Sequence, residues 1–306
     1  MKVLRALALA AATTMLGVGL VACAEAREPE RPQIVVTTNI LGDVVENLAG
    51  DAAAVTTLMK PNADPHSFEV SAQEAALMDS ADLLVTNGLG LEEGLQKHID
   101  RATSAGVPAV VAGDVITTLP YASGDAEGPD DPHFWTDPAR MVQVVNAAEA
   151  ALVEVDGIDT TQVHENADAY RAQLAALDTE MVETFAQIPS ERRALVTNHH
   201  VFGYLTERFD FRVIGAVIPG GTTLAAPSAA DLRDLTNAID KAGVRTIFAE
   251  SSQSDRLIQV LASEAGVHVN VVELYTESLT EPGGGADTYL LMMRTNTQRI
   301  ADGLTP

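Results

Sequence analysis

One long amphipathic helix is predicted near the middle of the 306-residue chain, where the sequence reads TTQVHENADAYRAQLAALDTEMVETFAQI from Thr160 to Ile188. Its apolar side chains recur at spacings of three and four, at Val163, Ala167, Tyr170, Leu174, Leu177, Met181, Phe185 and Ile188. That spacing places them on one face of a helix. At about 1.5 Å per residue the helix is roughly 40 Å long, enough to cross the whole body of the protein. A coiled-coil partner could cover the apolar face, but we expect it to pack against the protein's own lobes.

Short β-rich runs alternate with helical runs on both sides of this helix. The runs that favour strands lie at 33–40, 54–59, 82–87, 108–112, 194–197, 212–218, 246–250 and 268–274. Runs of helical character lie at 41–48, 71–79, 91–105, 201–208, 228–242, 254–264 and 287–301. Apolar strands separated by helices are typical of a parallel sheet covered on both faces. The sequence therefore predicts an α/β protein: two parallel-sheet α/β lobes, 33–158 and 190–306, joined by one long backbone helix within 159–189.

The N-terminus has the features of a secretory signal peptide. Lys2 and Arg5 are followed by a short stretch of small and apolar residues that ends at Ala22. Small residues directly before Cys23 are similar to the lipobox of bacterial lipoproteins, so we expect cleavage after residue 22 and a lipid on Cys23. The polar, proline-containing run 23–32 would then be a flexible tether to the membrane. This predicts an extracytoplasmic, lipid-anchored protein, periplasmic where the cell has two membranes.

Composition restricts the function. The chain has 43 acidic against 19 basic residues and a formal net charge of −24, which makes nucleic acid a poor partner. We interpret the excess acid as a solvated surface. Because Cys23 is the only cysteine, no internal disulfide can form, and stability has to come from buried apolar side chains.

Two copies of Asp-Pro-His, at 64–66 and 131–133, are the strongest functional signal, together with the pair His199 and His200. Proline fixes its own backbone angle and restricts the residue before it, so each motif carries its histidine on a stiff loop. In parallel α/β sheets, ligands bind beyond the carboxyl ends of the strands. His66 follows one predicted strand and His199 follows another. The pattern predicts metal ligands from separate loops that meet in the cleft between the lobes.

The chain resembles the metal-binding solute-binding lipoproteins of bacterial zinc and manganese ABC importers, the ZnuA/TroA-like family. The resemblance extends from Cys23 nearly to the C-terminus. It is carried by five motifs: NADPHSFE at 62–69, DPHFW at 131–135, HHVFGY at 199–204, FAE at 248–250 and GADTY at 285–289.

Carried over position by position, the resemblance implies four metal ligands: His66, His133, His199 and Asp287. Asp287 follows a glycine-rich run and precedes an apolar helical stretch, so it is also suited to be a helix N-cap, and the two roles can coexist. The resemblance implies that Glu250 supports a ligand from outside the metal's own shell, although an exposed strand end is an alternative. His200 is expected to be a neighbouring cap or a supporting residue.

Three imidazoles and one carboxylate suit tetrahedral zinc, and we prefer zinc to manganese, which takes more oxygen ligands. Many zinc-uptake relatives have a histidine-rich loop before the second ligand and a disulfide in the second lobe. This chain has neither, and an acidic loop at 125–131 stands in the first place. That loop could pass cations to the site or be merely solvated.

The function expected from these observations is capture of one divalent ion and its delivery to an ABC-transporter permease, by a monomer that performs no chemistry. A zinc hydrolase is the competing class, with Glu250 as general base. We consider it poorly supported, because a fourth protein ligand would occupy the position that a catalytic water needs. A role in surface attachment is a third alternative, for which no residue specifies a ligand.

Overall fold

The computed structural model describes residues 31–121, 129–218, 221–252, 256, 258–259, 261 and 269–305. The predicted signal peptide, Cys23, most of the tether and of the predicted helix 254–264, and the first part of the acidic loop lie outside the described residues. No helix within the described ranges combines the length and the apolar character needed to cross a membrane.

The N-terminal lobe contains one parallel sheet of four strands. They are β1 (Gln33–Val36), β2 (Ala54–Thr57), β3 (Leu83–Thr86) and β4 (Ala109–Val111), in the order β2-β1-β3-β4. Among the described residues before α5, the α-helices of this lobe are α2 (Asn39–Ala49), α3 (Ala72–Asp79) and α4 (Gln96–Ser104). The observed strands are two to four residues shorter than the predicted runs, because flanking residues belong to loops and helices. The parallel α/β prediction is confirmed.

The C-terminal lobe contains two parallel strand pairs. Its strands are β5 (Ala194–Thr197), β6 (Arg212–Ala216), β7 (Thr246–Glu250) and β8 (Asn270–Leu274), paired β5 with β6 and β7 with β8. Strand β5 lies beside β7, so the two pairs are neighbours. The helices described here are α7 (Gly203–Phe209), α8 (Ala229–Ala242) and α10 (Tyr289–Leu304).

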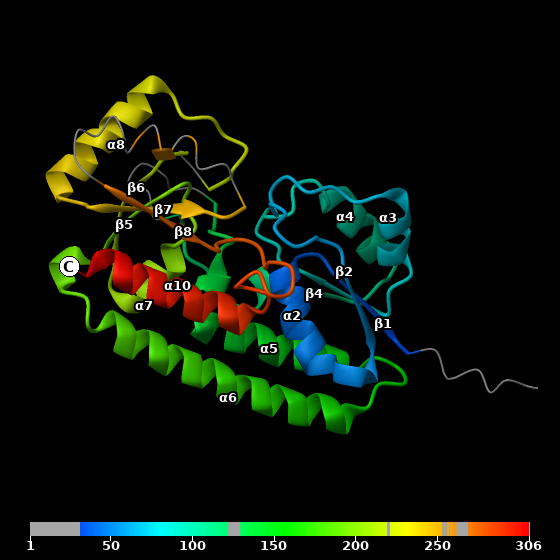
Figure 1. The fold of residues 1–306 in the computed structure, drawn as a ribbon. Helices are drawn as coiled ribbons and strands as arrows, with labels where there is room; N and C mark the ends of the chain where they lie inside the picture. Colours follow the sequence, from blue (N-terminus) through cyan, green and yellow to red (C-terminus); the bar gives the residue numbers. More distant parts are fainter. Residues whose placement is uncertain are drawn as a thin grey trace, which may run out of the picture. The chain divides into compact units, whose positions relative to one another are not determined.

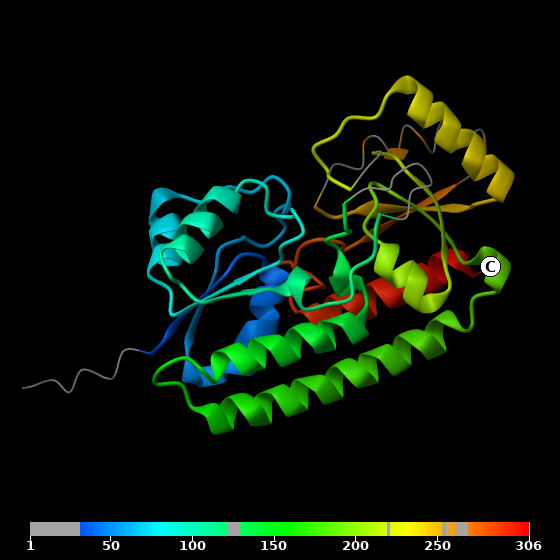
Figure 2. The same ribbon diagram turned by 180° about the vertical axis from the view of Figure 1, so that it is seen from behind.

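Helices α5 (Pro138–Leu152) and α6 (Thr160–Phe185) pack side by side and lie below the two lobes in Figures 1 and 2. Helix α6 is the predicted backbone helix and packs against α5, α2 and α10. Asp159 caps its start, since one carboxylate oxygen accepts the N–H groups of Thr161 and Gln162. The predicted apolar face is buried from Val163 to Phe185. Full burial of each large apolar side chain contributes about 1.5–3 kcal/mol, so packing fixes this helix more than its own propensity does.

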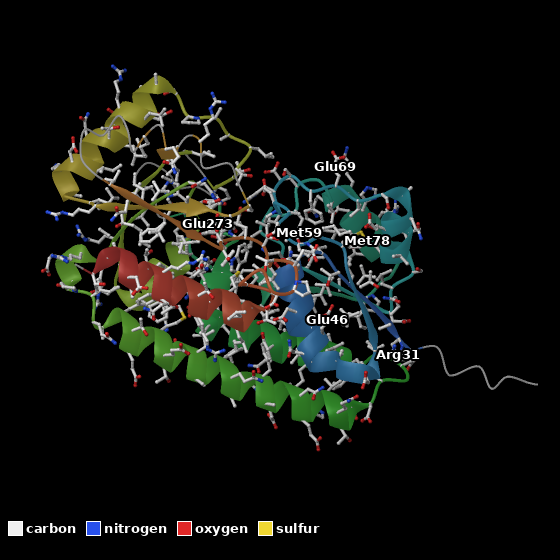
Figure 3. The ribbon with its side chains drawn as sticks, in the orientation of Figure 1. Arg31, Glu46, Met59, Glu69, Met78 and Glu273 are labelled. Carbon is white, nitrogen blue, oxygen red and sulfur yellow. The ribbon has the colours of Figure 1, made fainter. Side chains whose placement is uncertain are left out.

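One hydrophobic cluster is shared by the two lobes. It combines residues of the first sheet and α2 with residues of α5, α6, α7 and α10. Each lobe also has a smaller cluster of its own. Met78 of α3, labelled in Figure 3, is fully buried in the cluster between the first sheet and helices α3 and α4. The lobes are therefore joined by a common core as well as by the connecting helix.

Candidate metal centre

The two Asp-Pro-His motifs fold into the same local turn. His66 N–H donates to Asp64 Oδ1 at 2.9 Å, and His133 N–H donates to Asp131 Oδ1 at 2.9 Å. Aspartate often closes such turns by accepting from the backbone two residues on. The aspartate and the proline thus both restrict the backbone that presents each histidine.

Four side chains converge on one point, and they are His66, His133, His199 and Glu277. Each offers one ligand atom, and these atoms all lie within 4.8 Å of one another. Glu277 Oε1 is 3.0 Å from the Nε2 atom of His66, 3.3 Å from that of His133 and 3.2 Å from that of His199. His133 Nε2 is 3.3 Å from the Nε2 atoms of the other two histidines. We call these four residues the metal centre.

The fold explains why these residues meet. His66 lies in the loop after β2, His199 follows β5 and Glu277 follows β8, each beyond the carboxyl end of a parallel strand. His133 lies directly before the short turn Phe134–Thr136 that leads into α5. Asp137 caps α5 and Pro138 occupies its first turn, as the sequence predicts. The carboxyl edges of the strands and the start of one helix therefore supply all four side chains.

Two of the histidines are oriented by buried carboxylates. His133 Nδ1 is 2.6 Å from Asp131 Oδ1, and His199 Nδ1 is 2.6 Å from Glu250 Oε1. When Nδ1 donates its proton to a carboxylate, the Nε2 lone pair is left available to a metal, and the imidazole becomes a stronger base. Both pairs are buried, so the carboxylates fix the rings in the orientation that faces Glu277.

Glu277 is a buried carboxylate with an unusual environment. It is 1% exposed, and neither of its oxygens accepts a hydrogen bond of regular geometry from the described residues. Burial of a charged oxygen without a hydrogen bond costs several kcal/mol unless a cation compensates it. A divalent ion between Glu277 and the three imidazoles would remove that cost.

The electrostatics of the metal centre also favour a cation. Burial alone would raise the pKa of Glu277, but the nearby imidazoles of His199, His133 and His66 hold it well below its usual range. Burial lowers the pKa of His133 and His199, yet the adjacent carboxylates outweigh it and raise both, that of His199 strongly. The site thus keeps Glu277 ionised and attracts positive charge, protons in the metal-free protein or a metal ion in their place.

The structure does not bring Asp287 to the three histidines. Glu277 lies where the fourth ligand was expected, the position that the family resemblance implied for Asp287. Asp287 Oδ2 instead accepts the N–H of Gly283 at 2.8 Å, within the glycine-rich turn before α10. Nor is Asp287 the cap of that helix, because the Thr288 side chain accepts the N–H of Leu291. The glycine-rich turn directs this carboxylate back onto its own backbone.

Glu250 and His200 were both predicted to support a ligand, and their surroundings differ. Glu250 lies at the end of β7, where one oxygen accepts the backbone N–H of His199 at 3.1 Å and also faces its ring. His200 is half-buried and outside the metal centre, and burial lowers its pKa. Its Nδ1 has no hydrogen-bond partner among the described residues.

Glu277 was missed, although a signal for it was present. That signal is the rule that ligands lie beyond the carboxyl ends of parallel strands, which holds for carboxylates as well as for histidines. Glu277 follows the strand that ends at Leu274 and satisfies the same rule. The Asp-Pro-His motif that contains Asp131 predicts a stiff loop, but it does not predict the contact between this carboxylate and the ring of His133.

Fold and site together define a metal-binding solute-binding protein: two α/β lobes, a long backbone helix and a buried cluster of histidines and one carboxylate. The model of the family described as zinc-uptake complex component A, periplasmic, matches residues 34–303, and the chain belongs to that family.

Relatives of known name agree with this assignment but differ in the metal. The chain is 30% identical over 271 residues to the iron-binding protein YfeA of Yersinia pestis, covering 89% of this chain and 86% of that protein. It is 28% identical to the manganese-binding lipoprotein MntA of Halalkalibacterium halodurans, with 89% and 88% covered. Among solved structures, the periplasmic zinc-binding protein TroA from Treponema pallidum superposes with a TM-score of 0.83 at 28% identity, covering 90% of this chain and all of that one.

The family settles the class of function. The protein is an extracytoplasmic metal-binding component of an ABC importer, and the prediction that it is not an enzyme is confirmed by its family. The hydrolase alternative is therefore discarded. The position of Glu250 agrees with this, because the carboxylate considered as a general base is bonded to His199.

Proposed function

We propose that the protein captures one zinc ion and delivers it to an ABC-transporter permease. The ligands would be the Nε2 atoms of three histidines and the carboxylate of Glu277, in place of Asp287: His66, His133, His199 and Glu277. The observation that carries this proposal is the buried Glu277 carboxylate, which has no regular hydrogen bond and faces three imidazole nitrogens at 3.0–3.3 Å.

The spacing of the donors supports zinc. Donor atoms about 2.0–2.1 Å from a tetrahedral zinc are about 3.3–3.4 Å apart. The separations between His133 Nε2 and the other two Nε2 atoms, 3.3 Å each, match that value. Three nitrogens and one oxygen are also a ligand set that zinc accepts readily.

Manganese is the second candidate, because the chain is similar to a manganese-binding lipoprotein and a Mn-bound periplasmic metal-binding protein has the same fold. Manganese favours harder oxygen donors and a larger coordination number. The metal centre offers a single carboxylate against three imidazoles. Asp131 and Glu250 face Nδ1 atoms and are occupied in orienting the rings.

Delivery is proposed to follow membrane attachment. In this proposal residues 1–22 are a signal peptide, Cys23 carries the lipid and the run 23–32 tethers the body. The 33–158 and 190–306 lobes, joined through 159–189, present the loaded ion as a monomer to the permease. We propose no reaction on the ion itself.

Competitive loading tests this function. The purified protein is stripped of metal, offered zinc and manganese in equal amounts, and its bound metal per chain is measured by elemental analysis. One zinc per chain is expected. One manganese per chain would keep the importer function and reverse the choice of metal, whereas no stoichiometric metal would contradict the proposal.

A further inference from the structure

The loop that carries Glu277 is fastened to the N-terminal lobe, although it follows a strand of the C-terminal lobe. On one side of Glu277, the carbonyl oxygen of Thr276 accepts the indole N–H of Trp135 at 2.8 Å. Trp135 belongs to the segment of His133, and the two rings lie edge to face with centroids 5.3 Å apart. This side of the loop is thus bonded to the segment that presents another ligand.

Asn39 holds the other side of the loop through its amide. Asn39 Nδ2 donates to Ser278 Oγ at 2.8 Å, and Asn39 Oδ1 accepts the N–H of Leu279 at 2.9 Å. A third bond, from Asn39 Nδ2 to Lys60 O at 3.2 Å, uses the remaining donor within the N-terminal lobe. Leu279 O accepts the N–H of Asn62 at 2.9 Å. The residues next to Glu277 are therefore clamped by groups from the β1–α2 and β2–α3 connections.

Asn39 is well suited to fix the position of this loop. It is the first residue of α2, directly after the first sheet, and its side chain is buried. A buried amide that uses both its donor hydrogens and its acceptor is costly to leave unpaired, so its orientation is fixed. The bonds join residues about 240 positions apart in sequence.

His199 is held differently, by groups of the C-terminal lobe. Its backbone N–H and its ring both face Glu250 of β7, and its carbonyl oxygen accepts the hydroxyl of Thr197 at the end of β5. None of these three bonds involves a residue of the first sheet or of α2. The His133 loop is bonded to both lobes, through Asn87 and through Tyr204.

From these contacts we propose that Asn39 is the positioning residue for Glu277, and that the four ligands form a half-site of His66, His133 and Glu277 that His199 completes. The inference rests on the proposed function and deepens it. A three-ligand half-site holds zinc with a water in the fourth place, as open zinc sites do. His199 is then the ligand whose approach closes the site and whose departure begins release.

A merely structural role for Asn39 makes a different prediction. If Asn39 acts through Glu277, replacing it matters for the metal only while Glu277 is present. If Asn39 only stabilises the fold, its replacement weakens binding to the same degree in every background. Double-mutant cycles separate the two, because interacting residues give non-additive effects.

The experiment measures zinc affinity by competition with chelators of graded strength, for wild type and for Asn39→Ala alone, with Glu277→Ala and with His199→Ala. Asn39→Ala alone is expected to weaken binding by about 10–100-fold, the usual effect of losing a partner of a metal ligand. In the Glu277→Ala background the further loss should be less than about threefold, and in the His199→Ala background the full loss should recur.

Two further variants keep the test informative. Ser278→Ala removes the hydroxyl that Asn39 bonds with little change of volume, and it should show the same coupling with a smaller effect if Asn39→Ala does not fold. Asn166→Ala is the matched control: its side chain donates to Leu48 O at 3.1 Å, which joins α6 to α2, and its loss should leave zinc affinity unchanged.

Additivity of Asn39→Ala with Glu277→Ala, or coupling of equal size to His199→Ala, would overturn the inference while leaving zinc capture intact. Failure of the wild-type protein to take up zinc or manganese at all would overturn the proposed function and the inference with it.

Discussion

Glu277 and Asp287 lie on one segment between β8 and α10, yet their surroundings are opposite. Glu277 faces three imidazoles, which hold its pKa well below the usual range. Asp287 lies near the carboxylate of Asp43. The pKa of Asp43 is raised to about 6, chiefly by burial, with further contributions from the charges of Glu46 and Asp287.

The difference teaches what makes a carboxylate a ligand. Glu277 is fully buried, whereas Asp287 is only half-buried and its Oδ2 accepts the N–H of Gly283. At Glu277 the neighbours are bases that can share a cation. At Asp287 the neighbour is another acid, Asp43, which accepts the backbone N–H of Tyr289 at the start of α10. Both side chains are carboxylates on one loop, so burial and the facing side chains distinguish the two.

The largest expected effect is the contrast between Glu277→Ala and Asp287→Ala. Loss of Glu277 should weaken zinc binding by more than about 100-fold, beyond the 10–100-fold typical of residues that only support a ligand. Asp287→Ala should change affinity by less than about threefold. Isothermal titration or chelator competition measures both. Equal losses in the two variants would break the comparison.

Asp131→Asn and Glu250→Gln should give intermediate effects. Each keeps a hydrogen-bonding group of similar size beside its histidine and removes the charge that strengthens the ring as a base. We expect each to lower zinc affinity by about 10–100-fold. Glu149→Gln, which removes a carboxylate that contacts His164 far from the ligands, is the control and should have no effect on zinc. Wild-type affinity in both site variants would show that the carboxylates do not orient the ligands.

Zinc affinity should rise with pH, by up to about tenfold per unit for each proton displaced. The adjacent carboxylates raise the pKa values of His133 and His199 above the usual 6.5, so in the metal-free protein these rings hold protons at and above that pH. Their contribution to the stability of the metal-free protein is present below 6.5 and is lost as pH rises through the folded-state values. The gap in melting temperature between zinc-bound and metal-free protein should therefore widen from pH 6.5 to 8. A constant gap would contradict the protonation described here.

Asp43→Asn should produce the smallest change, a gain in stability of about 2 kcal/mol at pH 8 and little at about pH 3.5. The folded-state pKa of about 6 lies above the usual value of 3.8, so the ionised carboxylate destabilises the folded protein fully above pH 6. The penalty shrinks as pH falls from 6 to 3.8 and is absent below 3.8. Asparagine can still accept the N–H of Tyr289. Denaturant unfolding of the metal-free protein at the two pH values measures it. A loss of stability at pH 8 would show that the charge is needed at the start of α10.

Much of the fold could be predicted, because its signals are local. The three-and-four spacing from Val163 to Phe185 specifies one face of a helix wherever it packs. Apolar runs such as Leu83–Thr86 are buried on both faces and indicate a central parallel strand. The exact strand ends were less predictable, because they depend on pairing with neighbours.

The metal centre was predictable only in part. The prolines and the scarcity of histidine singled out His66, His133 and His199, which the structure brings together. Neither a neighbouring proline nor scarcity singles out Glu277, because in an acidic chain one glutamate among many carries little information. Its role depends on a clamp between Asn39 and Ser278, and that long-range contact leaves no periodic pattern in the sequence.

The central claim is that Glu277, with His66, His133 and His199, encloses one buried ion. Anomalous diffraction at the zinc edge from crystals of the zinc-loaded protein tests it most directly. The account predicts one strong peak per chain, about 2.0–2.2 Å from three Nε2 atoms and a Glu277 oxygen. A peak bound by Asp287, or one whose nearest protein atoms exclude Glu277, would contradict it.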